Sequence, residues 1–449
     1  MKTSECVALV SERVILKDGV REAAVLMQDG MIADVISRNE IPTGIQTEDF
    51  GNDVIMPGLI DAHVHINEPG RTDWEGFETA TQAAAAGGVT TLMDMPLNSA
   101  PVTTSVSSLL KKIDASTGKR FVDCGFYGGL IPGNEHEIEP LIEAGITGVK
   151  AFLCHSGIDD FPNATEKELR AVMPILAKHD IPLLVHAELV DANAPEIHHP
   201  QKYQEYMRSR PEHWEVNAIK MMLNLCRETG CRVHIVHLAA ASAIPILEQA
   251  KKEGLPVTVE TAPHYLFFAS ENIQDADTRF KCAPPIRTES NRKLLWEGLI
   301  SGLIDFVATD HSPSTLSLKE LESGNLVKAW GGISSLQLFL PALWSAAKEE
   351  GCSLGDIARW TSKNPAAFLG LKNKGNIQKG MKADLVVWQP EERFRVDAHD
   401  LYHKNPCTPY DGYELSGRVK ATWLDGVKVF DSQKVFGKPT GEIIKKSGV

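Results

Sequence analysis

Near its N-terminal end the chain contains the run Met56-Pro57-Gly58-Leu59-Ile60-Asp61-Ala62-His63-Val64-His65-Ile66-Asn67-Glu68-Pro69-Gly70-Arg71. Apolar residues closed on both sides by Pro-Gly are typical of a buried strand. Because side chains alternate across a strand, His63 and His65 face the same side, and so does Asp61. Two ring nitrogens directed at one point suit a divalent metal, and the Asp61 carboxylate could orient these histidines or ligate the metal itself. A chain with 15 His contains His-x-His about half the time by chance, so the pair alone is weak evidence.

Length, charge and cysteine content limit the kinds of protein this chain can be. At 449 residues it suits a large barrel with a second module. A net charge of -13 without blocks of like charge argues against a nucleic-acid partner, and no apolar run is long enough to span a membrane. Polar residues interrupt any signal-peptide core in residues 1–17, and eight unpatterned cysteines indicate reduced thiols. We expect a soluble intracellular, cytoplasmic protein; Ser447-Gly448-Val449 is not the Ser-Lys-Leu peroxisomal signal, although import by another route stays open.

The two ends of the chain share a pattern of alternating apolar and polar residues that the middle lacks. Residues 6–54 alternate apolar and polar positions around Asp18-Gly19 and Asp29-Gly30, which are hairpin dipeptides. The same alternation returns at 383–388 and 421–430. Neither end has enough strands for a core of its own, so we expect both to pair into one small β-sandwich. The predicted division is 1–54 and 371–449 for this sandwich, with 55–370 as an inserted unit.

The inserted unit alternates short apolar strands with helical stretches, which predicts an α/β fold with a parallel sheet. Eight strands are expected, at 58–66, 89–96, 120–130, 146–153, 182–188, 231–239, 256–264 and 305–312. Eight strand-helix units in about 300 residues fit a (β/α)8 TIM-type barrel, whose active site lies at the C-terminal strand ends. A doubly wound sheet is less favoured, because no Gly-x-Gly-x-x-Gly opens a helix and no P-loop occurs.

Polar residues gather at the C-terminal ends of these predicted strands. They are His63 and His65 on the first, Lys150 on the fourth, His186 on the fifth, His237 on the sixth and Asp310 on the eighth. Several histidines with an aspartate at one barrel mouth are rare as core residues and together predict a metal site. His234 precedes His237 by three residues, so on a strand only one of them can point into the barrel, and the pattern does not choose. Unmodified Lys150 is unexpected there, because an ammonium has no lone pair, and its default interpretation is a surface lysine.

Further motifs carry a resemblance that covers almost the whole chain. Besides the run 56–71 they include Met95-Pro96-Leu97-Asn98, Val149-Lys150-Ala151-Phe152, Val185-His186-Ala187-Glu188, Ile235-Val236-His237-Leu238, Ala283-Pro284-Pro285, Thr309-Asp310-His311-Ser312-Pro313 and Lys328-Ala329-Trp330-Gly331-Gly332. With these motifs the chain resembles the cyclic amidases of the amidohydrolase superfamily, most closely those that hydrolyse allantoin. The resemblance implies hydrolysis of a small cyclic amide, allantoin, to allantoate in purine and ureide catabolism, by a homo-oligomer, a tetramer in the family. The alternatives are a hydantoinase or dihydropyrimidinase acting on other cyclic ureides, and a non-catalytic scaffold homologue.

The same resemblance implies a site with two divalent metal ions, Zn²⁺ being the expected metal. The first would be held by His63, His65 and Asp310, and the second by His186 and His237, which matches the family ligand where His234 does not. Lys150, carbamylated to N6-carboxylysine, would bridge them. Asp310 would also be catalytic, taking the proton from the attacking hydroxide and passing it to the leaving ring nitrogen.

Departures from relatives bear on the substrate. Dihydroorotases carry an arginine at the position of Asn67, hydantoinases a tyrosine at that of His155, and many relatives a serine at that of Ala283. We expect Asn67, Asn98, His155 and groups near Ala283 and Gly332 to contact substrate, whereas His264 and His311 serve surrounding structure. Arg71 is the weakness of this interpretation, because its guanidinium could swing to the place that Asn67 leaves.

Overall fold

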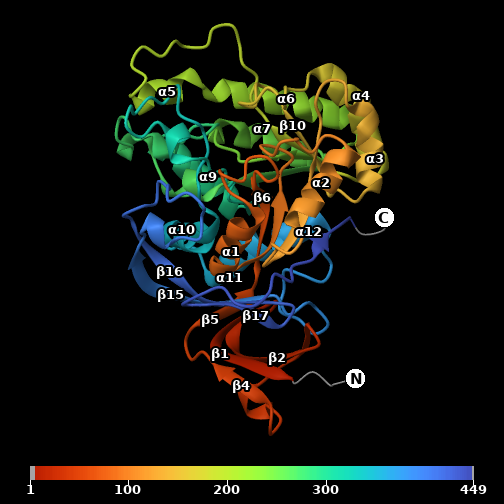
Figure 1. The fold of residues 1–449 in the computed structure, drawn as a ribbon, viewed down its shortest axis with the longest axis vertical. Helices are drawn as coiled ribbons and strands as arrows, with labels where there is room; N and C mark the ends of the chain where they lie inside the picture. Colours follow the sequence, from red (N-terminus) through yellow and green to blue (C-terminus); the bar gives the residue numbers. More distant parts are fainter. Residues whose placement is uncertain (1–5, 447–449) are drawn as a thin grey trace.

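Eight parallel strand segments form a barrel in the computed structural model, which describes residues 6–446 (Figure 1). The tripeptide 447–449 considered above lies outside the described residues. The barrel strands are β6 (Leu59–Val64), β7 (Val89–Asp94), β8 (Asp123–Phe126) with its continuation β9 (Gly128–Gly129), β10 (Val149–Phe152), β11 (Leu183–His186), β12 (Val233–Ile235), β13 (Val257–Thr261) and β14 (Phe306–Val307). Neighbours pair in parallel from β9 to β14 and from β6 to β8. A parallel bridge between Val64 and His311 closes the ring, so the predicted (β/α)8 barrel is confirmed.

Helices surround the barrel, as amphipathic and small-residue patterns predict. They are α1 (Phe77–Ala86), α2 (Val106–Ser116), α3 (Ile138–Glu143), α4 (Glu166–Lys178), α5 (Tyr203–Ser209), α6 (Glu212–Thr229), α7 (Ile244–Lys252), α8 (Pro263–Phe267), α9 (Glu289–Ile300), α10 (Phe339–Ala347), α11 (Leu354–Ala358) and α12 (Asn364–Leu369). Local chemistry sets their ends: Thr165 and Glu168 form a capping box at the start of α4, and α6 ends at Gly230, whose φ is 68°.

Both ends of the chain meet in a separate eight-stranded sheet below the barrel in Figure 1. Its strands are β1 (Val7–Leu16), β2 (Gly19–Gln28), β3 (Met31–Ile36), β4 (Gln46–Asp49), β5 (Val54–Pro57), β15 (Leu385–Arg395), β16 (Glu414–Leu424) and β17 (Val427–Asp431). Antiparallel pairing of β5 with β15 joins the two ends. Asp29 and Gly30 both have positive φ, as the tight hairpin between β2 and β3 requires. Apolar residues from both ends, among them Val25 and Trp423, share one core, which forms the expected small sandwich.

The terminal sheet joins the barrel at the N-terminal ends of the barrel strands, opposite the end where the predicted ligands lie. Gly58, between β5 and β6, donates its N–H to Asp384 O at 2.8 Å, and buried Lys374 bridges Asp123 of β8 and Asp384. The last strand, β18 (Ile443–Ile444), pairs with β8 of the barrel. The predicted boundaries at residues 54 and 370 stay a prediction.

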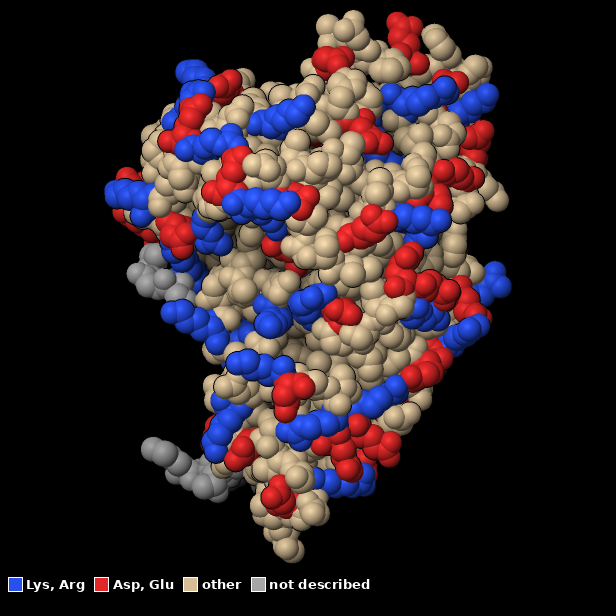
Figure 2. Space-filling model, turned by 180° about the vertical axis from the view of Figure 1, so that it is seen from behind, with Lys and Arg blue, Asp and Glu red and all other residues tan. Residues whose placement is uncertain are grey.

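The surface carries both signs of charge. Figure 2 shows basic and acidic side chains interspersed over the face that it presents, rather than one basic region. Among the helices of residues 6–446, none has the length and apolar character needed to cross a membrane.

Candidate metal centre

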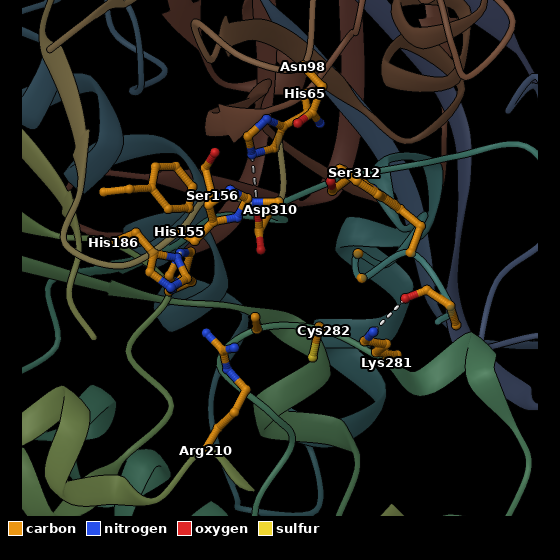
Figure 3. Close-up of a pocket in the computed structure, with 18 of the residues that line it drawn as sticks. His65, Asn98, His155, Ser156, His186, Arg210, Lys281, Cys282, Asp310 and Ser312 are labelled. Atoms are coloured by element: carbon orange, nitrogen blue, oxygen red, sulfur yellow. Dashed lines mark hydrogen bonds and ion pairs between the residues drawn. The ribbon is translucent and has the colours of Figure 1, made fainter. Parts of the chain in front are cut away.

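The six predicted ligands lie around one cavity of about 480 Å³ at the C-terminal ends of the barrel strands. They are His63 of β6, His65 just after it, Lys150 of β10, His186 of β11, His237 after β12 and Asp310 after β14. Figure 3 shows His65, His186 and Asp310 from different strands facing the same space. The barrel therefore brings together residues that are up to about 250 positions apart, because parallel strands end at one rim.

His63, His65 and Asp310 form a first group that could hold a metal ion. Asp310 Oδ1 lies 3.2 Å from His63 Nε2 and 3.4 Å from His65 Nε2. The other nitrogen of each ring is already engaged, His65 Nδ1 with Leu97 O at 2.8 Å and His63 Nδ1 with Glu260 Oε1 at 2.5 Å. In both rings the Nε2 lone pair is thus left for a metal.

His186 and His237 form a second group. His186 Nδ1 lies 3.0 Å from His237 Nε2, and His186 Nε2 faces Glu188 Oε2 at 2.7 Å. Burial lowers the pKa of His186 and places that of His237 well below its usual value. Both rings are therefore neutral, which is the form that ligates metal.

Lys150 is fully buried between these groups, so its default interpretation as a surface lysine is wrong. Its Nζ has no hydrogen-bond partner among the described residues and lies 5.1 Å from the centre of the Phe152 ring. Burial lowers the pKa of this amine to about 8. A buried ammonium without a partner is costly, whereas a neutral amine can react with carbon dioxide and become an anion.

Left-handed backbone at non-glycine residues occurs at this mouth. The φ angle is 68° at Asn67, 39° at His237 and 48° at Asp310. Such angles are uncommon outside glycine, and they show that the chain has left regular strand geometry at these points. The alternation rule therefore fails beyond the strand ends.

His234 and His237 show that alternation along a strand does not predict where side chains beyond its end point. His234 lies in β12 and is fully buried, with its ring stacked 5.2 Å from that of Phe306 of β14. His237 follows two residues after the strand ends and turns into the mouth. The expectation that only one of the two histidines points into the barrel is thus wrong, since His234 lies deeper inside and His237 at the rim.

Buried carboxylates hold the ligand residues in place. Asp61 accepts hydrogen bonds from the backbone N–H of His63 at 3.2 Å, from Thr309 N–H at 3.1 Å and from Thr309 Oγ1 at 2.5 Å. It orients the segments that carry His63 and Asp310 and is not among the residues that line the cavity. Glu260 was missed by sequence reasoning, and no local pattern relates it to His63.

Four of the five residues expected to contact substrate line the cavity, namely Asn98, His155, Ala283 and Gly332. The His155 side chain is largely exposed, and its Nε2 lies 3.4 Å from Asp159 Oδ1. A side chain at Gly332 would clash with Ser312 O, because an added Cβ would lie 2.3 Å from it.

Asn67 does not line the cavity: its amide donates to Pro313 O at 3.3 Å and accepts from Asn98 Nδ2 at 3.2 Å. Sequence reasoning missed further lining residues, including Arg210, Lys281, Ser312 and Trp330.

Two further histidines, His264 and His311, are buried and do not line the cavity. His311 Nδ1 accepts the backbone N–H groups of Ser335 at 3.0 Å and Leu336 at 3.3 Å, as expected for a structural role. The ring of His264 packs against Tyr265, with 4.2 Å between centroids.

Fold and site together define an amidohydrolase. Residues 54–429 match the Amidohydrolase family, and the chain belongs to that family. Among curated relatives, a protein of Streptomyces avermitilis named allantoinase is 46% identical over 98% of this chain and 98% of its own length. Allantoinases of Arabidopsis thaliana and Saccharomyces cerevisiae are 44% and 41% identical over 94% and 98% of this chain and 88% and 99% of their own lengths. The solved structure of L-hydantoinase (dihydropyrimidinase) from Arthrobacter aurescens has a TM-score of 0.91 and 29% identity, covering 98% of this chain and all of that one (100%).

Proposed function

We propose that this chain is a binuclear metal hydrolase that opens the hydantoin ring of allantoin to give allantoate. One observation carries the proposal: the six predicted ligands, Asp310 included, line a single cavity in a chain whose full-length relatives are named allantoinases. The donor set fits divalent metal, because His63, His65 and Asp310 direct lone pairs at one point and the ring nitrogens of His186 and His237 lie 3.0 Å apart beside them. His63, His65 and Asp310 would hold one ion and His186 and His237 the other, with zinc as the expected metal and carbamylated Lys150 between them.

Two ions bound here would polarise the amide carbonyl and make a water molecule acidic enough to attack near neutral pH. The protein's own groups supply the rest. Asp310 is mostly buried but opens on the cavity, so its carboxylate can take the proton of the attacking water and deliver it to the leaving ring nitrogen. Lys150 supports the carbamate because its buried amine meets no carboxylate within hydrogen-bond distance.

The substrate proposal rests on where cations stand around the cavity. Dihydroorotate carries a ring carboxylate, and burying that charge without a paired cation costs several kcal/mol. Arg71 does not line the cavity, since it donates to Asn98 O, lies 3.7 Å from Asp160 and stacks on Trp74. It is therefore held away from the place of the missing arginine. Of the cations that do line the cavity, Arg210 is paired with Glu188, and Lys281 donates to Val327 O at 3.0 Å. The uncharged ureido group of allantoin is instead met by donors and acceptors such as Asn98, His155 and the backbone near Gly332.

Steady-state kinetics test this assignment. We expect a specificity constant for allantoin at least about 100-fold above that for dihydroorotate, corresponding to a difference of several kcal/mol in charge burial. Hydantoin and dihydrouracil should be assayed under the same conditions. A higher value for dihydroorotate contradicts the proposal, and a preference for hydantoin or dihydrouracil favours the hydantoinase alternative, which the structural likeness to L-hydantoinase supports.

Metal analysis separates a catalyst from a scaffold homologue, since a non-catalytic relative lacking a working centre would hold no stoichiometric metal. With excess zinc, His237→Ala should bind less metal per chain than the unmodified protein, because a ligand is gone. His234→Ala should reach the full complement under the same conditions, because His234 donates no lone pair to the centre. Full metal in the His237 variant and loss in the His234 variant would reverse the ligand assignment.

Assembly and compartment are further proposals. We propose a homo-oligomer, a tetramer as the family resemblance implies, that acts on a small molecule in the cytoplasm. All eight cysteines are free thiols, which fits a reducing compartment.

A further inference from the structure

One buried carboxylate contacts ligand residues of both proposed metal positions. Glu260 Oε1 lies 2.5 Å from His63 Nδ1 and 3.4 Å from the backbone nitrogen of His237. The side chain comes from β13 and is only 1% exposed. We infer that Glu260 is a positioning residue that sets the two metal positions relative to each other; the inference rests on the proposed metal centre.

The contact with His63 decides which nitrogen can ligate. In the tautomer in which Nδ1 donates its proton to Glu260, Nε2 keeps its lone pair for a metal. That Nε2 lies 3.2 Å from Asp310 Oδ1 and has no hydrogen-bond partner among the described residues. The contact with His237 acts on the backbone, at a residue whose φ of 39° needs support from its surroundings. Glu260 therefore acts on one ligand of each set, by a different means in each.

His234 holds Glu260 from the other side. Its Nε2 lies 3.0 Å from Glu260 Oε2, and its Nδ1 lies 2.8 Å from Thr258 Oγ1. The ring is stacked on Phe306 at an interplanar angle of 9°. The result is a buried row in which Thr258 fixes His234, His234 fixes Glu260, and Glu260 fixes His63 and His237. The histidine that is not a ligand is thus connected to the metal centre through a single carboxylate.

Glu188 provides a natural comparison. Its Oε2 lies 2.7 Å from His186 Nε2, and its Oε1 accepts from Arg210 Nε at 3.1 Å. Figure 3 shows the Arg210 side chain directed toward His186. Among residues 6–446, Glu188 thus has a hydrogen bond to one ligand residue, His186. Loss of Glu188 should affect one metal position first, whereas loss of Glu260 should affect both.

The first experiment compares Glu260→Gln with Glu188→Gln. Zinc-loaded protein is dialysed against graded chelator concentrations, and the zinc retained per chain is measured. Glutamine keeps the size of glutamate but has one acceptor oxygen instead of two, so it cannot accept from both of its neighbours. Changes of this kind typically cost 10 to 100-fold in metal affinity, so a shift of about that size is expected. We expect Glu260→Gln to release both ions at lower chelator concentration and Glu188→Gln to leave one ion retained at the wild-type concentration. Release of a single ion by Glu260→Gln overturns the inference.

The second experiment separates positioning from packing at His234. His234→Gln keeps a donor for Glu260 but loses the stacked ring, while His234→Phe keeps a ring against Phe306 and loses the donor. Positioning predicts near wild-type zinc retention in His234→Gln and several-fold weaker retention in His234→Phe. The reverse order, which a packing role alone produces, overturns the inference.

Asp384→Asn serves as the control. Asp384 is a buried carboxylate beside Lys374 at the opposite end of the barrel, so its variant should lower the unfolding temperature without changing zinc retention. If Asp384→Asn releases zinc as Glu260→Gln does, the effect is general destabilisation and the inference is overturned. An unmodified chain that holds no zinc contradicts the proposed function instead, so the two failures are distinguishable.

Discussion

Replacement of Lys150 by alanine is expected to abolish hydrolysis and to lower metal content. The carbamate would be lost, so the site would hold less negative charge to offset that of two divalent ions. Metal ions contribute several kcal/mol to such reactions, so the rate should fall about 1,000-fold or more. Turnover of allantoin and elemental analysis of the same preparation measure both effects.

Chemical rescue provides the control for this variant. Alanine at position 150 leaves a space beside Phe152 in the cavity, where a short carboxylic acid could stand in for the carbamate. Acetate or propionate should therefore restore part of the activity of Lys150→Ala but not of His186→Ala, which loses a neutral ligand. A Lys150→Ala protein with wild-type rate and metal content would remove the carbamate from the mechanism.

Asp310→Asn is expected to lose about 10² to 10⁴-fold in turnover, the size of a general acid-base contribution, with little change in stability. Asparagine has the same size as aspartate and is among the few residues that tolerate a φ of 48°. The backbone at the barrel mouth should therefore persist while the proton acceptor is gone. Turnover at saturating zinc and the unfolding temperature, measured together, check both parts.

Asp61→Asn is the matched comparison for the aspartate variant. Asp61 faces only donors, from His63 and Thr309, and an amide NH₂ there would leave one of them without an acceptor. This variant should lose stability before it loses chemistry, the opposite of Asp310→Asn. An Asp310→Asn protein that folds, holds metal and turns over within a few-fold of the unmodified enzyme would disprove the proposed proton transfer.

Local sequence patterns determined the barrel, the terminal sheet and the positions of the first two histidine ligands. Period-two alternation placed His63 and His65 on one face, and strand-helix alternation predicted the barrel that gathers strand ends at one mouth. The hairpin dipeptide Asp29-Gly30 marked the terminal strands that pair into the second sheet. Each of these features depends on neighbours within a few residues, which is why the sequence alone carries them. The role expected for Lys150 came from family resemblance, because a lone lysine has no periodicity to interpret.

Only the tertiary structure decided which groups hydrogen-bond the ligand residues and which side chains line the cavity. Asn67, two residues after His65, was expected to face the substrate, but the strand ends at Val64 and a left-handed turn at Asn67 directs its amide to Asn98 and Pro313. Glu260 meets His63 from almost 200 residues away (|i−j| = 197), a contact that no local spacing encodes. The sequence determines which side chains stand at the ends of strands, whereas the turns beyond those ends depend on long-range packing and hydrogen bonding, and only the folded chain sets them.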